Sequence, residues 1–361
     1  MAGFVNEYRE KVKESSIEKV RDMLSDMPDY VRTYINGISQ NHMETTLLAY
    51  LIDIRNFLTW ICVQNPSFTG NNVKSVDLKQ ISLKALESLR SEDFEEYLSY
   101  LDMYDSVLGP DGKRKNGVRS KRRKLSAIRS LYAYLFKNDK ISVNPILKVD
   151  MPDSRTLGRH RVTALEPNEA ALFMDAVEYG SGLTDRQIAH HGKYKARDLA
   201  IVTLLLSTGI RVSECVGLDI DHINLEEMKM TVVRKGGFND EVYFNEETYD
   251  ALYDYLQERK KMVPEKESEN ALFLSNRMKR ITVRSVEMLV SKYAKSSVPG
   301  KHIKVHSLRS SCATAMIESG EQLTTVKDIL GHASVSTTQL YIQDSKASKR
   351  RAAANRKLRE S

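Results

Sequence analysis

The sequence predicts a two-domain protein that is mainly α-helical and carries one small antiparallel β-sheet. Apolar residues recur three and four positions apart in segments such as TTLLAYLIDIRNFLTWIC and KLSAIRSLYAYLF, which is the pattern of amphipathic helices. One stretch, MKMTVVRKGGFNDEVYFN, instead contains two short β-rich runs joined by a glycine-containing turn. A length of 361 residues favours two domains over one.

The amino-terminal half is expected to be an all-helical domain over residues 1–152. Its helical periodicity extends from Asp29 to about Lys148. The turn residues of GPDGKRKNGVRSKRRK interrupt this pattern with a loop, and positions 113–124 hold eight Lys or Arg among twelve residues.

This basic run has two interpretations. It can be a solvated loop and helix start, or it can be a surface that binds phosphates. The second is favoured because the cations begin an amphipathic helix, whose first turn can enter a DNA major groove while its apolar face packs inside. The candidate DNA-binding residues are Arg119, Lys121, Arg122, Arg123 and Lys124.

A boundary follows the helical half. The segment between Pro152 and Pro167 lacks apolar periodicity, and a new helix is expected after Glu166. We therefore expect an interdomain linker at residues 153–165, a second domain at 166–345 and a basic tail at 346–361.

The second domain is predicted to be helical around the β-hairpin. KARDLAIVTLLLSTG reads as a helix that ends at Gly209, and Lys235 occupies the hairpin turn. The segment YGSGLTDRQIAHHGKYKA is expected to be a surface insertion. Its His190 and His191 have no Cys or acidic neighbours at metal-ligand spacing, so both are expected to be exposed loop histidines.

A turn near the carboxyl end is predicted to position a tyrosine. Gly331 can end the helix TTVKDIL. Ser336 and Gln339 have capping-box spacing for the next helix, which presents Tyr341.

Composition narrows the classes of function. A formal net charge of +7 points toward polyanionic partners such as nucleic acid, although anionic membranes and ordinary basic surfaces share that signature. No apolar run of about 18 residues exists, and the charged amino terminus does not resemble a secretory signal, so we expect a cytoplasmic protein without a membrane partner. Cys62, Cys215 and Cys312 are isolated, which disfavours a disulfide framework or a zinc site.

Recognisable cofactor motifs are also missing from the sequence. It contains no phosphate-binding loop of the type G-x-x-x-x-G-K-[ST], no H-E-x-x-H pair and no evident cluster of metal-binding carboxylates. We therefore expect no metal and no cofactor.

Several charged side chains in the second domain suit phosphodiester chemistry. Arg211 follows the helix-ending Gly209, and His306 lies three positions before Arg309, on the same face of a helix. Two guanidinium groups can flank one phosphate and offset the charge that grows as the phosphorus becomes five-coordinate. A tyrosine, with an ordinary pKa of about 10, becomes a nucleophile only where nearby cations or a base favour its ionised form.

Five motifs in a fixed order, TGIRVSE, RKGG, HSLR, LGHAS and TTQLYI, resemble those of the tyrosine recombinases, also called the phage integrase family. The resemblance covers residues 165–343, and the preceding helical half is similar to the core-binding domain of that family. It implies a helical, SAM-like core-binding domain followed by a mixed α/β catalytic domain.

The resemblance implies a role for each matching position. Arg211 and Arg309 match the paired arginines that clamp the phosphate, and Tyr341 matches the nucleophile that forms a 3'-phosphotyrosyl link. One departure lies after the second arginine, where Ser310 and Ser311 replace the usual His or Arg and Thr. This puts a packing contact in doubt but leaves the chemistry intact.

The remaining polar positions are also filled. Lys235 matches the hairpin lysine that protonates the leaving 5'-oxygen, and His306 matches the histidine used in proton transfer. His332 matches the His or Trp position that bonds the scissile phosphate. Glu214 matches the acidic residue that supports the site.

The implied activity is metal- and ATP-independent cutting and rejoining of double-stranded DNA at inverted-repeat sites, through a Holliday junction and by a homotetramer on two sites. The stretch MPDYVRTYI, the insertion before KARDLAIVTLLLSTGIRVSE and the length resemble Xer-type enzymes that work without a second recombinase and resolve chromosome dimers. The sequence does not identify an accessory protein.

Other functions remain open at this point. An integrase or excisionase of a phage or mobile element would share the site, but such enzymes often carry an arm-binding domain, for which the 28 or so residues before Asp29 leave little room. A DNA-relaxing topoisomerase is a lesser alternative. A non-catalytic, site-specific DNA-binding protein would need only the basic surfaces.

Overall fold

The computed structural model describes residues 7–64, 77–102, 104–105, 113–114, 116–153, 162–332 and 334–344. The chain divides into two compact units, a first unit within residues 7–160 and a second unit within residues 161–361. Most of the expected linker, the basic tail and much of the glycine-containing loop before residue 116 lie outside the described residues. The predicted domain bounds therefore stay predictions.

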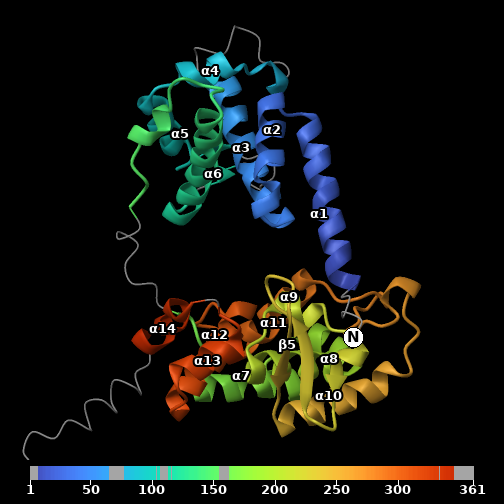
Figure 1. Cartoon of the computed structure of the whole chain (residues 1–361). Coiled ribbons are helices and arrows are strands. Elements are labelled where there is room, and N and C mark those ends of the chain that lie inside the picture. The colour runs from blue at the N-terminus through green and yellow to red at the C-terminus, as the bar shows by residue number, and fades with distance from the viewer. Residues whose placement is uncertain are drawn as a thin grey trace, which may run out of the picture. The chain divides into compact units, whose positions relative to one another are not determined.

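The first unit is mainly helical (Figure 1), and a short antiparallel strand pair departs from the all-helical expectation. Its α-helices are α1 (Glu7–Ser25), α2 (Asp29–Ile38), α3 (Glu44–Gln64), α4 (Leu83–Ser88), α5 (Ser91–Tyr100) and α6 (Val118–Lys137). Shorter elements are the 3-10 helices η1 (Ser39–Asn41), η2 (Leu78–Gln80) and η3 (Pro145–Lys148) and the antiparallel pair β1 (Tyr104–Asp105) and β2 (Lys113–Arg114).

The core of this unit forms around α3, which lies against α1 and α6. Leu51, Ile54, Phe57 and Ile61 follow one another at helical spacing along α3, and none of them is exposed. Facing positions on α6 are buried in the same way. Helix α1 precedes Asp29, where the sequence pattern had not indicated a helix.

Among the described helices, α3 is long and apolar enough over Glu44–Val63 to meet a length-and-hydropathy criterion for a membrane span. Its apolar positions are instead part of the core of the first unit. The helix also carries Asp53, whose buried carboxylate bonds the ammonium group of Lys124 at 3.2 Å. These features are those of a core helix.

The second unit combines helices with a small sheet. Its helices are α7 (Pro167–Tyr179), α8 (Asp185–Thr208), α9 (Val212–Val216), η5 (Ile220–His222), α10 (Glu246–Arg259), η6 (Lys266–Ser268), α11 (Val283–Ser297), α12 (Val305–Ser319), α13 (Leu323–Leu330) and α14 (Val335–Asp344). The antiparallel strands β3 (Ile223–Asn224), β4 (Lys229–Val233) and β5 (Asn239–Tyr243) lie in that order.

Helix α8 packs against α7, α10 and α12. Helices α12 and α13 both contact α14. The predicted hairpin is confirmed, with β4 and β5 joined by a turn in which Gly236 and Gly237 adopt positive φ values. The predicted helix ends at Gly209 and Gly331 are also confirmed, because both residues adopt the left-handed conformation.

One expectation was wrong in part: residues 180–184 of YGSGLTDRQIAHHGKYKA connect α7 to α8, but the segment is helical from Asp185 onward. Thr184 and Gln187 form a capping box, and α8 then continues without a break to Thr208. His190 is exposed, as expected, but His191 is buried, with Nε2 2.8 Å from the carbonyl oxygen of Val177. The first buried residue of α8 is the polar His191. Apolar periodicity therefore did not indicate where this helix begins.

The second correction concerns the helix that carries Tyr341. Ser336 does not cap α14, which begins at Val335. The hydroxyl of Ser334 instead accepts a hydrogen bond from the backbone N–H of Ser336 at 3.2 Å. The helix therefore begins two residues earlier than the predicted capping box requires, since Ser336 as the N-cap would place the first helical residue at Thr337.

Candidate active site

Arg211 is held where α8 ends and α9 begins. Gly209 turns the chain, and Arg211 then stands at the N-cap of α9. Its Nη1 donates to Oε1 of Glu214 at 2.8 Å, and its backbone N–H donates to Oε2 of the same carboxylate at 2.9 Å. Its Nη2 donates to the carbonyl oxygen of Gly331 at 3.1 Å, which connects α9 to the end of α13.

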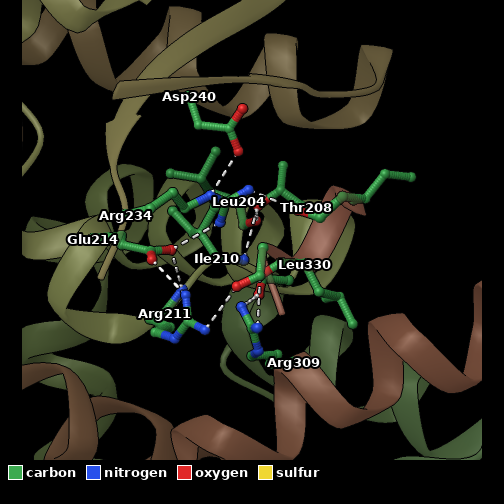
Figure 2. Close-up of polar contacts among 12 residues, drawn as sticks. Leu204, Thr208, Ile210, Arg211, Glu214, Arg234, Asp240, Arg309 and Leu330 are labelled. Carbon is green, nitrogen blue, oxygen red and sulfur yellow. Dashed lines mark hydrogen bonds and ion pairs between the residues drawn. The ribbon is translucent and has the colours of Figure 1, made fainter. Parts of the chain in front are cut away.

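Arg309, on α12, reaches the same place. Its Nη1 donates to the carbonyl oxygen of Gly209 at 2.6 Å, and its Nη2 donates to that of Leu330 at 2.7 Å. Figure 2 shows Arg309 and Arg211 directed toward the end of the helix that contains Leu330. Burial, followed by the charge of Arg211, lowers the pKa of Arg309 to about 10, so its guanidinium group remains charged at neutral pH.

A third arginine, Arg234, completes this cluster. It is 1% exposed and lies at the end of β4. Its Nε donates to Oδ2 of Asp240 at 2.8 Å, its Nη1 to Oε2 of Glu214 at 3.1 Å, and its Nη2 to the carbonyl oxygen of Ile329 at 2.7 Å (Figure 2). It therefore ties the hairpin to α9 and to the end of α13.

The sequence analysis missed Arg234, although the sequence contains a signal for it. Met230 and Val232 are buried and alternate with less buried residues along β4, so the next position on the same face is 234. A charged residue on the buried face of a strand needs partners, and this need identifies it as part of a network.

Gly331 makes room for that network. Its φ is +63°, and a Cβ atom at this position would lie 2.8 Å from Nε of Arg234. Glycine therefore serves two purposes here, since it allows the left-handed turn and the close approach of the guanidinium group.

His332 and Tyr341 pack together immediately after this turn. Their rings are nearly parallel, at 15°, with centroids 6.3 Å apart. Nδ1 of His332 lies 2.9 Å from Oγ1 of Thr338. Burial, reinforced by the charges of Arg309 and Arg211, lowers the pKa of His332 to about 4, so its ring is neutral at physiological pH.

Tyr341 is 4% exposed and packs against Ala313, Ile317, Val326 and Leu330. No described residue forms a hydrogen bond with its hydroxyl. A charged phenolate at this position would raise the pKa of Arg309, so the oxygen lies within electrostatic reach of that guanidinium group. The tyrosine is thus apolar in its packing but close to a cation.

Two further candidates lie at the surface. His306 is exposed in the first turn of α12, and its charge contributes to the lowered pKa of His332. Lys235 is exposed in the hairpin turn, and no described residue forms a hydrogen bond or ion pair with it. The structure therefore brings Arg211, Arg309, Glu214, His332 and Tyr341 together and places His306 near them. Lys235 has no hydrogen bond or ion pair with the described residues of this group.

In the first unit, the structure corrects the expectation for Lys124. Its side chain is buried, and its ammonium group bonds the buried carboxylate of Asp53 at 3.2 Å. Arg123 bonds the other oxygen of that carboxylate and is itself half exposed. Lys124 therefore belongs to the core, because a buried aspartate needs a cation that a local sequence pattern does not reveal.

The other candidate DNA-binding residues on α6 are more accessible than Lys124. Lys121 bonds Asp102 at 2.5 Å, and Nη1 of Arg122 donates to the carbonyl oxygen of Pro152 at 2.6 Å. Arg119 is exposed at the start of the helix. Of the five candidates, Arg119 is therefore the most available to bind a phosphate.

Among the described residues, one group has the composition of a metal site. Asp219, Asp221 and His222 have ligand atoms within 4.8 Å of one another. The carboxylate of Asp219 already pairs with Arg280, and Nδ1 of His222 accepts from the backbone N–H of Asp219. Because a guanidinium group supplies the positive charge there, these donors form an ion-pair cluster that does not fit a resident cation.

Comparison with known proteins gives consistent matches. The phage integrase family matches residues 164–348. Tyrosine recombinase XerC of Caldanaerobacter subterraneus subsp. tengcongensis is 32% identical over 321 residues, covering 87% of this chain and 82% of the relative. Tyrosine recombinase XerS of Streptococcus agalactiae serotype III (strain NEM316) is 33% identical over 350 residues, covering 91% and 95%.

Solved structures share the fold at lower identity. The XerH site-specific recombinase bound to palindromic difH substrate has a TM-score of 0.64 and 18% identity, with coverage of 94% of this chain and 88% of that chain. A lambda integrase (75–356) dimer bound to a COC' core site has a TM-score of 0.59 and 15% identity, with coverage of 88% and 95%. The predicted fold, mainly α with a small antiparallel sheet, is confirmed.

Proposed function

The chain belongs to the phage integrase family and is a tyrosine recombinase of the Xer type, an enzyme that cuts and rejoins DNA, and we propose that Tyr341 is its nucleophile. One observation carries the proposal. Arg211 and Arg309 bond the consecutive carbonyl groups of Gly331 and Leu330, and the next residue, His332, stacks on Tyr341. A phenol, two guanidinium groups and a neutral imidazole thus meet at one turn.

Both arginines keep donors available for a phosphate. A guanidinium group has five N–H donors. The side chain of Arg211 uses one on Glu214 and one on Gly331, and that of Arg309 uses one on Gly209 and one on Leu330. The remaining donors can bind the non-bridging oxygens and offset the extra charge of a five-coordinate phosphorus.

In the proposed cleavage step, the oxygen of Tyr341 attacks the phosphorus and forms a 3'-phosphotyrosyl link. The bond to the 5'-oxygen breaks, and Lys235 supplies the proton that this leaving group needs. His306 accepts the proton that the hydroxyl of Tyr341 loses, and Nε2 of His332 donates a hydrogen bond to a phosphate oxygen. Tyr341 is 4% exposed, so the packing over its hydroxyl must open for DNA to reach it, whereas Lys235 is exposed in its turn and its side chain can extend to the 5'-oxygen from the surface.

Glu214 supports this site through charge and position. Its carboxylate is buried and bonds Arg211 through Oε1 and Arg234 through Oε2. One negative charge therefore holds two cations in place and leaves the cluster net positive, as a phosphate site requires.

The covalent intermediate keeps the energy of the phosphodiester bond, so a 5'-hydroxyl from a partner duplex can reseal it without ATP. We propose that two such rounds pass through a Holliday junction, on a homotetramer that holds two inverted-repeat sites. The similarity to XerC and XerS supports chromosome dimer resolution in the cytoplasm as the purpose of the reaction.

The test is covalent capture of DNA. Genomic fragments that remain attached to the wild-type protein after denaturation identify the target, and a nicked duplex of that sequence then traps the intermediate, because the short 5'-hydroxyl strand diffuses away. We expect an adduct with wild-type protein, none with Tyr341→Phe, and a normal yield with Tyr253→Phe, whose side chain is exposed on α10.

Two results would contradict the proposal. An adduct of normal yield with Tyr341→Phe would assign the nucleophile to another residue. Tight, sequence-specific binding without any adduct would identify a protein that holds DNA sites without cutting them.

A further inference from the structure

Thr338 contacts the candidate active site from the helix that carries the nucleophile. It is fully buried, and it lies three residues before Tyr341 on α14, which places both on the same side of that helix. Its hydroxyl oxygen is 2.9 Å from Nδ1 of His332. None of the roles proposed above uses this contact.

The direction of this hydrogen bond follows from the surroundings of the hydroxyl group. A buried threonine in a helix ordinarily donates its proton to a backbone carbonyl three or four residues earlier. Thr338 makes no such bond to any described residue, and Nδ1 of His332 is its one acceptor among them. Because a buried hydroxyl proton needs an acceptor, the hydroxyl donates and Nδ1 accepts.

The ring of His332 therefore carries its proton on the opposite nitrogen. A neutral imidazole has one N–H, and if Nδ1 accepts, that N–H is at Nε2. Double protonation is disfavoured by burial and by the charges of Arg309 and Arg211. A ring fixed in this state presents a donor at Nε2, and a phosphate oxygen is an acceptor.

We propose that Thr338 is a positioning residue, whose hydroxyl group holds the single ring proton of His332 on Nε2 so that this nitrogen can donate to the scissile phosphate. The inference rests on the role of His332 in the proposed function. It also links that role to the nucleophile, because Thr338 and Tyr341 belong to the same helix.

The first test measures single-turnover cleavage of the nicked duplex. Thr338→Val keeps the size of the side chain but removes the donor, and we expect a rate loss of about tenfold, the lower end of the loss seen when the hydrogen-bond partner that orients a metal-binding histidine is removed. Thr338→Ser restores the hydroxyl and should recover most of the rate.

The control repeats Thr338→Val in a protein whose residue 332 has a ring with only one possible protonation state. His332→Trp places an indole N–H, which is only a donor, at the same position. In this background, Thr338→Val should change the rate less than about twofold if its effect acts through the state of the imidazole. An equal loss in both backgrounds would show that Thr338 acts only through packing and would overturn the proposal.

The second test does not depend on catalysis. With ring nitrogen-15 labelling of histidine, the signals of His332 are assigned by their loss in His332→Trp. Wild-type protein and Thr338→Ser should show an unprotonated Nδ1 and a protonated Nε2, and Thr338→Val should show increased protonation of Nδ1. A proton on Nδ1 of the wild-type protein would overturn the proposal.

The two tests separate this inference from the proposed function. If the proposed function failed, the wild-type protein would form no adduct with any genomic fragment, while the state of the ring would be unchanged. If only the role of Thr338 failed, the adduct would form normally and the rate would not respond to Thr338→Val.

Discussion

Arg234 and Glu214, which are twenty residues apart in the sequence, form a buried ion pair with 3.1 Å between Nη1 and Oε2. The other oxygen of Glu214 bonds Arg211. The carboxylate of Glu214 thus connects Arg234, which the sequence did not predict as a site residue, to Arg211, which it did. Its further bonds to Asp240 and Ile329 extend this connection to the hairpin and to the end of α13.

Removing Arg234 should destabilise the second unit. Arg234→Gln leaves the buried carboxylate of Glu214 with one cation fewer, and loss of a partner from a buried ion pair costs about 3–5 kcal/mol. Urea denaturation measures this loss. Arg284→Gln is the matched control, since Arg284 pairs with Glu287 at an exposed position of α11, and it should leave the midpoint unchanged. Equal midpoints for the two variants would contradict the network.

Gly331→Ala should also lower stability. The substitution forces a Cβ atom to within 2.8 Å of the Arg234 side chain at a backbone φ of +63°. A loss of roughly 1–3 kcal/mol in the free energy of unfolding is expected. Gly192→Ala provides the control, because that glycine lies within α8 with open space around its Cβ position, and alanine there should be neutral or stabilising. A neutral Gly331→Ala would show that Arg234 is not held against this turn.

The role of Lys235 as a general acid can be tested by changing the leaving atom of the substrate from oxygen to sulfur. If Lys235 protonates the departing 5'-oxygen, Lys235→Met should slow cleavage by roughly 10²–10⁴-fold, the usual contribution of a positioned general acid. Sulfur in place of the bridging 5'-oxygen leaves without a proton, so the same variant should cleave that substrate at close to the wild-type rate. If sulfur does not restore cleavage, the lysine contributes binding and not protonation.

The basic residues of α6 should divide into two groups. Arg119 is exposed, so Arg119→Ala should weaken DNA binding and reduce the slope of log affinity against log salt by about one, with unfolding unchanged. Lys124 is buried against Asp53, so Lys124→Met should instead destabilise the first unit. Fluorescence anisotropy over a salt series measures the first effect, and urea denaturation the second. A changed salt slope with normal stability for Lys124→Met would return Lys124 to the DNA-binding surface.

The lowered pKa of His332 predicts a loss of stability in acid. The unfolded chain takes up the proton below about pH 6.5, whereas in the folded protein the pKa of His332 is about 4. The unfolded state therefore binds more protons between these values, and stability should fall by up to about 3 kcal/mol as the pH decreases from 6.5 to 4.

Unfolding in urea at several pH values checks this expectation. His332→Gln should lose less stability than the wild type over this interval, whereas His190→Gln, at an exposed position, should follow the wild type. If His332→Gln followed the wild-type curve, the ring would not be held neutral by burial and the surrounding cations.

Sequence reasoning predicted the features that depend on neighbouring residues. The helical repeat of α3, the hairpin around Gly236 and the helix ends at Gly209 and Gly331 all follow from local periodicity and from the backbone freedom of glycine. The order of the five motifs predicted the family for the same reason, because each motif is a short continuous segment.

Burial of polar residues could not be predicted in this way. His191 is buried because the carbonyl oxygen of Val177 on α7 lies within hydrogen-bonding distance of its Nε2. Lys124 is buried because its ammonium group bonds the carboxylate of Asp53 on α3. A charged or polar residue can enter a core only where a partner satisfies it. These partners are 14 and 71 residues away, and no local pattern identifies them.

The sequence alone thus determined which chemical groups the protein has and in which order they occur. Tertiary structure alone decided which of them meet: Arg211 and Arg309 at the end of α13, Arg234 behind them, and Thr338 against His332. The physical reason is that hydrogen bonds act over about 3 Å, whereas these partners come from segments up to 120 residues apart, so the folded chain must first bring them together.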